Sequence, residues 1–164
     1  MRTATQFKNG NLPFLSDNPS GKEIELFSLY AKANRIDDQH ISVTFGLRYT
    51  EMIEALITIF KDCSSPDWDC YGALPVTYEA IIEAAKIINL LPYTLPVPDI
   101  YAEPTGDICF EWNSKNGHLF VICVSGKHKI GYAGIFGESK AYGMEYFEQS
   151  LPSGIVNNIR RVYA

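Results

Sequence analysis

PDWDCYGALP, the sequence of residues 66–75, lies between two helical patterns. It combines turn-forming and aromatic residues to a degree that an unstructured linker does not. Asp67 and Asp69 are of the type that accepts hydrogen bonds from nearby backbone N–H groups and so holds turns. Trp68 and Tyr71 have large apolar bodies with polar tips that need a partner when buried. Together these residues predict a loop that its aromatic side chains anchor on the core.

Two interpretations of this loop stay open. In the structural one, Trp68 is largely buried between the helices and the strands that follow, and Asp69 accepts hydrogen bonds from its own turn. In the functional one, Trp68, Asp69 and Tyr71 line a site for a ligand or a partner, because such sites often lie on loops that a rigid scaffold positions.

Helical patterns flank the loop on both sides. Before it, apolar residues recur at i, i+3, i+4 and i+7 and predict a helix over residues 47–61. After it, Thr77 stands where the N-cap of a helix over residues 78–91 would be, and the prolines that follow prevent its continuation. The apolar stripe of the first helix consists of Ile53, Leu56, Ile57 and Phe60.

Toward the N-terminus the pattern is weaker. Residues 1–19 are polar, are interrupted by glycine and proline, and read as an irregular arm. Ser20 and Glu23 have the spacing of a capping box and predict a helix to about Asn34. Residues 41–45 alternate in polarity like a short strand.

From Ile100 onward the hydrophobic period changes from that of helices to two, which is typical of strands. Pro152 and Ser153 then open a last short helix. Helices, then strands, then a helix predict an α+β domain over residues 20–164, with helices packed on one face of a roughly four-stranded antiparallel meander. The expected strands are residues 108–112, 118–125, 130–136 and 142–147.

Charge and cysteine content narrow the classes of function. The net charge of −5 lacks the basic footprint of nucleic-acid binding and permits a basic protein partner. No apolar run is long enough for a membrane helix, and we expect no membrane association and a cytoplasmic location. The four cysteines match no zinc spacing, and Cys109 and Cys123 lie in apolar runs, so we expect all four to be reduced.

Few residues are candidates for chemistry. Asp69 and Glu111 would form a carboxylate pair for acid–base work if the loop packs on the first hairpin. In the alternative, Asp69 caps its own turn and Glu111 faces solvent or pairs with a lysine. The histidines, at positions 40, 118 and 128, form no metal pair, so the sequence predicts no catalytic residue, metal or cofactor.

A second segment of interest joins the last two strands. Residues 134–140 carry two glycines and end on Lys140, next to Tyr142. The segment is either an ordinary turn or an edge that a partner uses. The chain has ten tyrosines, more than a core can hold, and exposed tyrosines favour contacts between proteins.

Several short motifs resemble a set of short uncharacterised bacterial proteins that carry W-D-G-Y-G-A, a helix, prolines, P-D-G and a Glu-Trp strand. The matching residues are Trp68-Asp69-Cys70-Tyr71-Gly72-Ala73, Pro75, Pro104-Thr105-Gly106-Asp107 and Glu111-Trp112. The similarity covers about residues 47–163. Here Cys70 replaces the usual glycine, and Thr105-Gly106-Asp107 departs from P-D-G. Such proteins often accompany mobile elements and toxin or defence genes, and the resemblance implies no activity.

Two hypotheses from different classes follow. The first is a non-enzymatic interaction factor, of the immunity, antitoxin or inhibitor type in bacterial or phage conflict, with a protein partner and with homo-oligomers also open. The second is a small-molecule-binding protein or minor hydrolase that uses the 67–73 loop with Glu111. For either, the candidate residues are Trp68, Asp69, Tyr71, Glu111, Lys140 and Tyr142.

Overall fold

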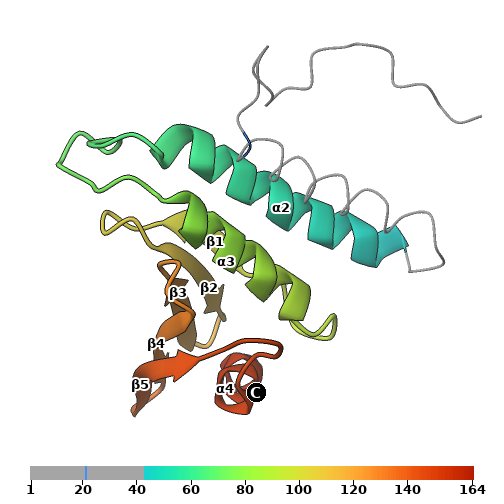
Figure 1. The fold of residues 1–164 in the computed structure, drawn as a ribbon. Coiled ribbons are helices and arrows are strands. Elements are labelled where there is room, and N and C mark those ends of the chain that lie inside the picture. The colour runs from blue at the N-terminus through green and yellow to red at the C-terminus, as the bar shows by residue number, and fades with distance from the viewer. Residues whose placement is uncertain (1–20, 22–42) are drawn as a thin grey trace, which may run out of the picture.

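The computed structural model describes Gly21 and residues 43–164. The arm over residues 1–19, the helix predicted from Ser20 (apart from Gly21) and residues 41–42 of the predicted strand lie outside these residues. The elements are α2 (Val43–Cys63), α3 (Tyr78–Leu90), β1 (Asp99–Ala102), β2 (Ile108–Asn113), β3 (Leu119–Val124), β4 (Lys129–Phe136), β5 (Ser139–Tyr146) and α4 (Ser153–Val162), as Figure 1 shows.

The strands form one antiparallel sheet in the order β1-β2-β3-β4-β5. The predicted α+β class with an antiparallel sheet is therefore confirmed, whereas the expected number of four strands is wrong. The additional strand is β1, which has four residues and follows Pro98 directly. So short a strand between prolines has no alternation long enough to identify it.

The helices around the central loop agree with the apolar periodicity. α3 covers nearly the predicted range, and the Thr77 hydroxyl accepts a hydrogen bond from the Ala80 N–H at 3.2 Å, as an N-cap does. α2 begins at Val43, so the strand expected over residues 41–45 is wrong for residues 43–45. An alternation of polarity over so few residues is a weak preference for a strand. The helical pattern that follows it in the same segment outweighs this preference, and α2 runs unbroken from Val43 to Cys63.

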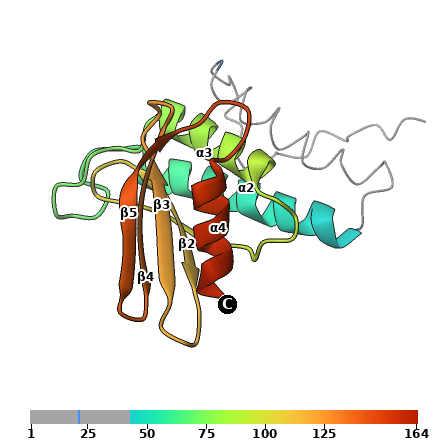
Figure 2. The same cartoon turned by 90° about the horizontal axis from the view of Figure 1, so that it is seen from below.

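The core lies between one face of the sheet and the helices. α3 contacts β2 and β3, α4 contacts β2, β3 and β4, and α2 contacts α3 and β1. Figure 2 shows α3 and α4 on the same side of the sheet. The buried face of β2 and β3 consists of Ile108, Phe110, Trp112, Phe120, Ile122 and Val124. The Trp112 indole N–H is satisfied within this core, since it donates to the Pro96 carbonyl at 2.9 Å.

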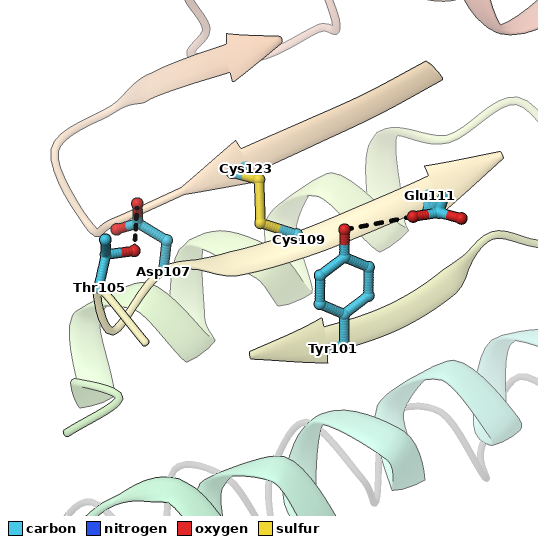
Figure 3. Close-up of a disulfide and its surroundings, with 6 residues drawn as sticks. All are labelled: Tyr101, Thr105, Asp107, Cys109, Glu111 and Cys123. Atoms are coloured by element: carbon cyan, nitrogen blue, oxygen red, sulfur yellow. Dashed lines mark hydrogen bonds between the residues drawn. A yellow bond between two sulfur atoms is a disulfide. The ribbon is translucent and has the colours of Figure 1, made fainter. Parts of the chain in front are cut away.

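Cys109 and Cys123 form a disulfide, which overturns the expectation that all four cysteines are reduced. The two residues are directly opposite each other in the β2–β3 register (Figure 3). Each cysteine taken alone looks like a small apolar residue of a strand. Only the register of the hairpin shows that they meet. Cys63 and Cys70 are free thiols.

Removal of this disulfide tests its contribution to stability. The bond closes a loop with a sequence separation of 14. Loops of about 15 residues are worth roughly 3 kcal/mol in the chain-entropy account, so Cys109→Ser with Cys123→Ser should lower the free energy of unfolding by about 2–4 kcal/mol. Urea denaturation measures the change, and a reductant should shift the wild-type curve but not the variant curve. Equal midpoints for the oxidised wild type and the variant would contradict this.

Candidate functional site

The loop between α2 and α3 is held by its two aspartates. The Asp69 carboxylate accepts from the backbone N–H groups of Tyr71 at 2.8 Å and Ala73 at 3.1 Å, as predicted. The Asp67 carboxylate accepts from the Gly72 N–H at 2.7 Å. The Asp67 N–H in turn donates to the Ala73 carbonyl at 2.8 Å. The loop is therefore a closed polar turn in which the backbone N–H groups of residues 70–73 have local acceptors.

The aromatic side chains of this loop differ in their surroundings. Trp68 is half-buried at the edge of the core, and its indole N–H donates to the Leu74 carbonyl at 3.0 Å. The expected burial of Trp68 is therefore confirmed in part, since the ring packs against the core without being fully enclosed. Tyr71 is 93% exposed and anchors nothing.

Cys70 has φ +62°, a left-handed conformation that favours glycine. This is the position at which the W-D-G-Y-G-A motif has glycine. Cys70→Gly should therefore stabilise the protein by about 0.5–1 kcal/mol, net of the greater freedom of glycine in the unfolded chain. Cys70→Ala, which keeps a Cβ atom, is the matched control and should unfold like the wild type. Thermal and urea unfolding compare the three proteins, and a less stable Cys70→Gly protein would exclude strain at this site.

The loop is attached to the end of the sheet where β1 and β2 are joined. The Leu74 N–H donates to the Pro104 carbonyl of the turn between β1 and β2 at 2.8 Å. A Cβ atom on Gly106 would lie 2.8 Å from the Pro75 carbonyl oxygen. The two turns therefore approach so closely that only glycine fits at position 106. In Figure 2 the loop projects beyond the sheet on the side opposite α4.

The side chains that do not enter the core share the other face of the sheet, which we call the outer face. One row across it, read from the strand register, is Asp99, Glu111, Val121, Ala133 and Tyr142. The neighbouring row is Tyr101, Cys109, Cys123, Gly131 and Met144, and a third is Asn113, Leu119, Ile135 and Lys140. Three of the candidate residues from the sequence, Glu111, Lys140 and Tyr142, therefore lie on one surface.

The outer face is most exposed over β4 and β5. Its large apolar side chains there are exposed to 45% at Ile135, 82% at Tyr142, 63% at Met144 and 68% at Tyr146. Lys140 is also exposed, at the opposite end of β5 from Tyr146. An apolar group of this size on one face is typical of surfaces that bind other molecules.

Glu111 stands at the other side of the outer face. Its carboxylate accepts a hydrogen bond from the Tyr101 hydroxyl at 3.3 Å (Figure 3). Burial raises the pKa of Tyr101 above its ordinary value, and the negative charges of Glu111 and Glu103 raise it further. Glu111 thus has a tyrosine as its partner, where the sequence offered solvent, a lysine or Asp69. The carboxylate of Asp69 is engaged in its own turn.

The raised pKa of Tyr101 gives stability a defined pH dependence. The unfolded chain loses the Tyr101 proton near pH 10, before the folded chain does, so this contribution is complete below about pH 10 and is lost as the pH rises through the folded pKa. The free energy of unfolding of Tyr101→Phe should therefore fall less steeply above pH 10 than that of the wild type. Tyr49 and Tyr163 also have raised pKa values, but both remain in the variant and cancel in the comparison. Superimposable pH profiles would contradict the assignment.

A buried carboxylate that the sequence analysis missed ties α3 to the turn between β3 and β4. Glu83 is 3% exposed and accepts from the backbone N–H groups of Gly126, at 2.7 Å, and of His128. The Nδ1 atom of His128 lies 3.2 Å from the same carboxylate. A cavity of about 230 Å³ adjoins this contact, lined by Tyr78, Glu79, Ile82, Glu83, Lys86, Gly126 and His128. In the sequence, the only indication of this contact is a glutamate on the apolar face of a predicted helix. Its hydrogen-bond partners can be identified only from the three-dimensional structure.

Searches for metal-binding clusters, for membrane helices and for similar proteins identify no further site in the described residues. Within residues 43–164 no three His, Cys, Asp or Glu side chains are grouped so that they could hold a metal ion. Within the same part of the chain no helix has the length and apolar character needed to cross a membrane. Comparisons with protein-family models, curated proteins and solved structures find no match. The resemblance of residues 47–163 to the W-D-G-Y-G-A proteins therefore stays a prediction.

Proposed function

We propose that this chain is a non-enzymatic protein-interaction factor that recognises its partner with the outer face of the sheet. The observation that carries the proposal is the exposure of Ile135, Tyr142, Met144 and Tyr146 on a single face of a rigid sheet. Tyrosine and methionine are enriched at the centres of protein interfaces, where charged residues are depleted.

The charges of the outer face indicate the chemistry of the partner. Asp99 and Glu111 are directly opposite each other on β1 and β2, and like charges so placed repel each other. Neither forms a salt bridge with another residue of the described part of the chain. A basic group on the partner would relieve this repulsion, and the net charge of −5 favours the approach of such a surface. The proposed partner is therefore a protein with an apolar patch beside basic side chains.

Reversal of the two acidic charges tests this proposal. In capture from cells of the source organism, the wild-type chain should retain a protein that Asp99→Lys/Glu111→Lys loses. With that protein purified, the double variant should bind at least about tenfold more weakly, since one factor of ten is about 1.4 kcal/mol. Binding to the wild type should also weaken as the salt concentration rises.

The matched control is Glu51→Lys/Glu54→Lys, which makes the same change in net charge at two exposed carboxylates of α2, on the helical side of the sheet. It should bind like the wild type. If both double variants lose the partner equally, the loss is an effect of net charge alone. If both retain it equally, the acidic side of the outer face is not part of the interface.

An immunity, antitoxin or inhibitor-like role is the narrower form of the proposal, and the resemblance to the W-D-G-Y-G-A proteins is what supports it. It requires that the retained partner have an activity of its own that binding abolishes. Titration of the partner's activity with the wild type and with Asp99→Lys/Glu111→Lys distinguishes this role from simple association.

A further inference from the structure

We infer that two copies of this chain associate through β5, edge to edge and antiparallel, so that their sheets become one. This inference rests on the edge of the sheet rather than on its outer face, and it does not depend on the proposed function. It concerns the unpaired side of one strand, on which the backbone N–H and C=O groups offer hydrogen bonds to another strand.

The two edges of the sheet differ in how they are protected. β1 has four residues, follows Pro98 and contacts α2. β5 has eight residues, and β4 is its only neighbour in the sheet as far as the structure describes the chain. Short strands, adjacent prolines and covering helices are devices that prevent edges from pairing with other chains. β1 has all three, whereas β5 is long, has no adjacent proline and has no helix packed closely on it within residues 43–164.

The register of β5 also leaves it regular along its whole length. Each residue from Ser139 to Tyr146 pairs with one residue of β4, without a bulge. The strand contains no proline. Its two charges, which oppose pairing, are Lys140 on the outer face and Glu145 on the inner face, and each stands near an end of the strand. The four residues between them, Ala141 to Met144, are uncharged. Such a strand is a regular template for antiparallel pairing.

Symmetry restricts how β5 can pair with itself. A two-fold axis perpendicular to the sheet keeps the outer faces of both copies on the same side. An outer-face residue of one copy therefore pairs with an outer-face residue of the other. Since outer-face residues alternate along the strand, the numbers of two paired residues add to an even sum. With Gly143 on the axis, Tyr142 pairs with Met144 of the other copy, and Lys140 pairs with Tyr146. Sulfur–aromatic and cation–π contacts are both favourable.

Two local features fit this register. Lys129 already lies over the Tyr146 ring, 5.2 Å from its centroid, which shows that this ring accepts a lysine on the outer face. On the inner face, a Cβ atom at Gly143 would lie 2.6 Å from the Tyr132 hydroxyl oxygen. The Tyr132 side chain therefore fills the inner side of β5 where the axis would pass, and the two glycines leave room for one such ring from each copy.

A pair of charge variants tests both the association and its register. Tyr142→Lys/Met144→Lys places lysines opposite lysines twice across the axis and should weaken the dimer at least about tenfold. Tyr142→Glu/Met144→Lys places a glutamate opposite a lysine twice and should keep the dimer. If instead Tyr142 stood on the axis, the two glutamates of this variant would meet and each new lysine at position 144 would face Lys140 of the other copy, so the variant would dissociate.

Sedimentation equilibrium of the full chain over a concentration series is the measurement, and the wild type should dimerise with a dissociation constant between roughly 1 µM and 1 mM, as expected of a small interface. The control is Leu74→Lys/Tyr93→Lys, which replaces two exposed apolar side chains away from the sheet by lysines and should dimerise like the wild type. Because both β5 positions are exposed, all variants should melt as the wild type does.

Three outcomes would overturn the inference: a wild type that is monomeric throughout this range, a like-charge variant that dimerises as well as the wild type, or an opposite-charge variant that dissociates. The result is independent of partner capture. If the wild type is monomeric and captures a partner that Asp99→Lys/Glu111→Lys loses, the inferred dimer is excluded and the proposed function stands.

Discussion

The burial of Phe110, Trp112, Phe120 and Ile122 against α3 and α4 is the constraint on which the rest of the structure depends. Side chains alternate along a strand with a period of two, so once these residues enter the core, their neighbours must point the other way. A register shift of one residue would turn every side chain of a strand to the opposite face. The disulfide, the Tyr101–Glu111 hydrogen bond and the exposed row on β5 are all consequences of the register that this burial selects.

Two polar contacts hold α3 at one end of the sheet, where the β1–β2 and β3–β4 turns both lie. In the first, Glu83 accepts the N–H groups of the turn between β3 and β4 from within α3. In the second, Asp67 and Asp69 close the loop before α3, and Leu74 attaches that loop to the turn between β1 and β2. A buried carboxylate without donors would cost several kcal/mol, so Glu83 stabilises one position of α3 and disfavours alternatives. The apolar core alone would fix this position less sharply.

Local rules account for the parts of the fold that the sequence predicted well. Thr77 begins α3 because an N-cap needs only the three residues after it, and Asp69 holds its turn because its donors are two and four residues away. The final helix follows from the spacing of Ile155, Ile159 and Val162, all of which are buried.

The parts that the sequence did not predict depend on contacts between distant residues. Cys109 meets Cys123 only through the hairpin register, and Glu83 meets His128 only through the packing of α3 on the sheet. Tyr71 shows the converse error. Its size predicted an anchor on the core, but its side chain is 93% exposed, whereas Trp68 does pack against the core. The grouping of Glu111, Lys140 and Tyr142 on one face likewise needed the register of five strands.

The edge and the outer face have a joint consequence for binding. Two sheets joined through β5 would present one continuous outer face, with the apolar side chains of β4 and β5 at its centre. The pair Asp99 and Glu111 of each copy would then lie at the two far ends, since β1 and β2 are at the side of the sheet away from β5. A partner with two basic patches at matching separation would engage both ends, and the second contact would form at a high effective concentration. A partner with one patch would gain nothing from the dimer. Self-association would therefore select the shape of the partner without changing any contact that a single copy makes.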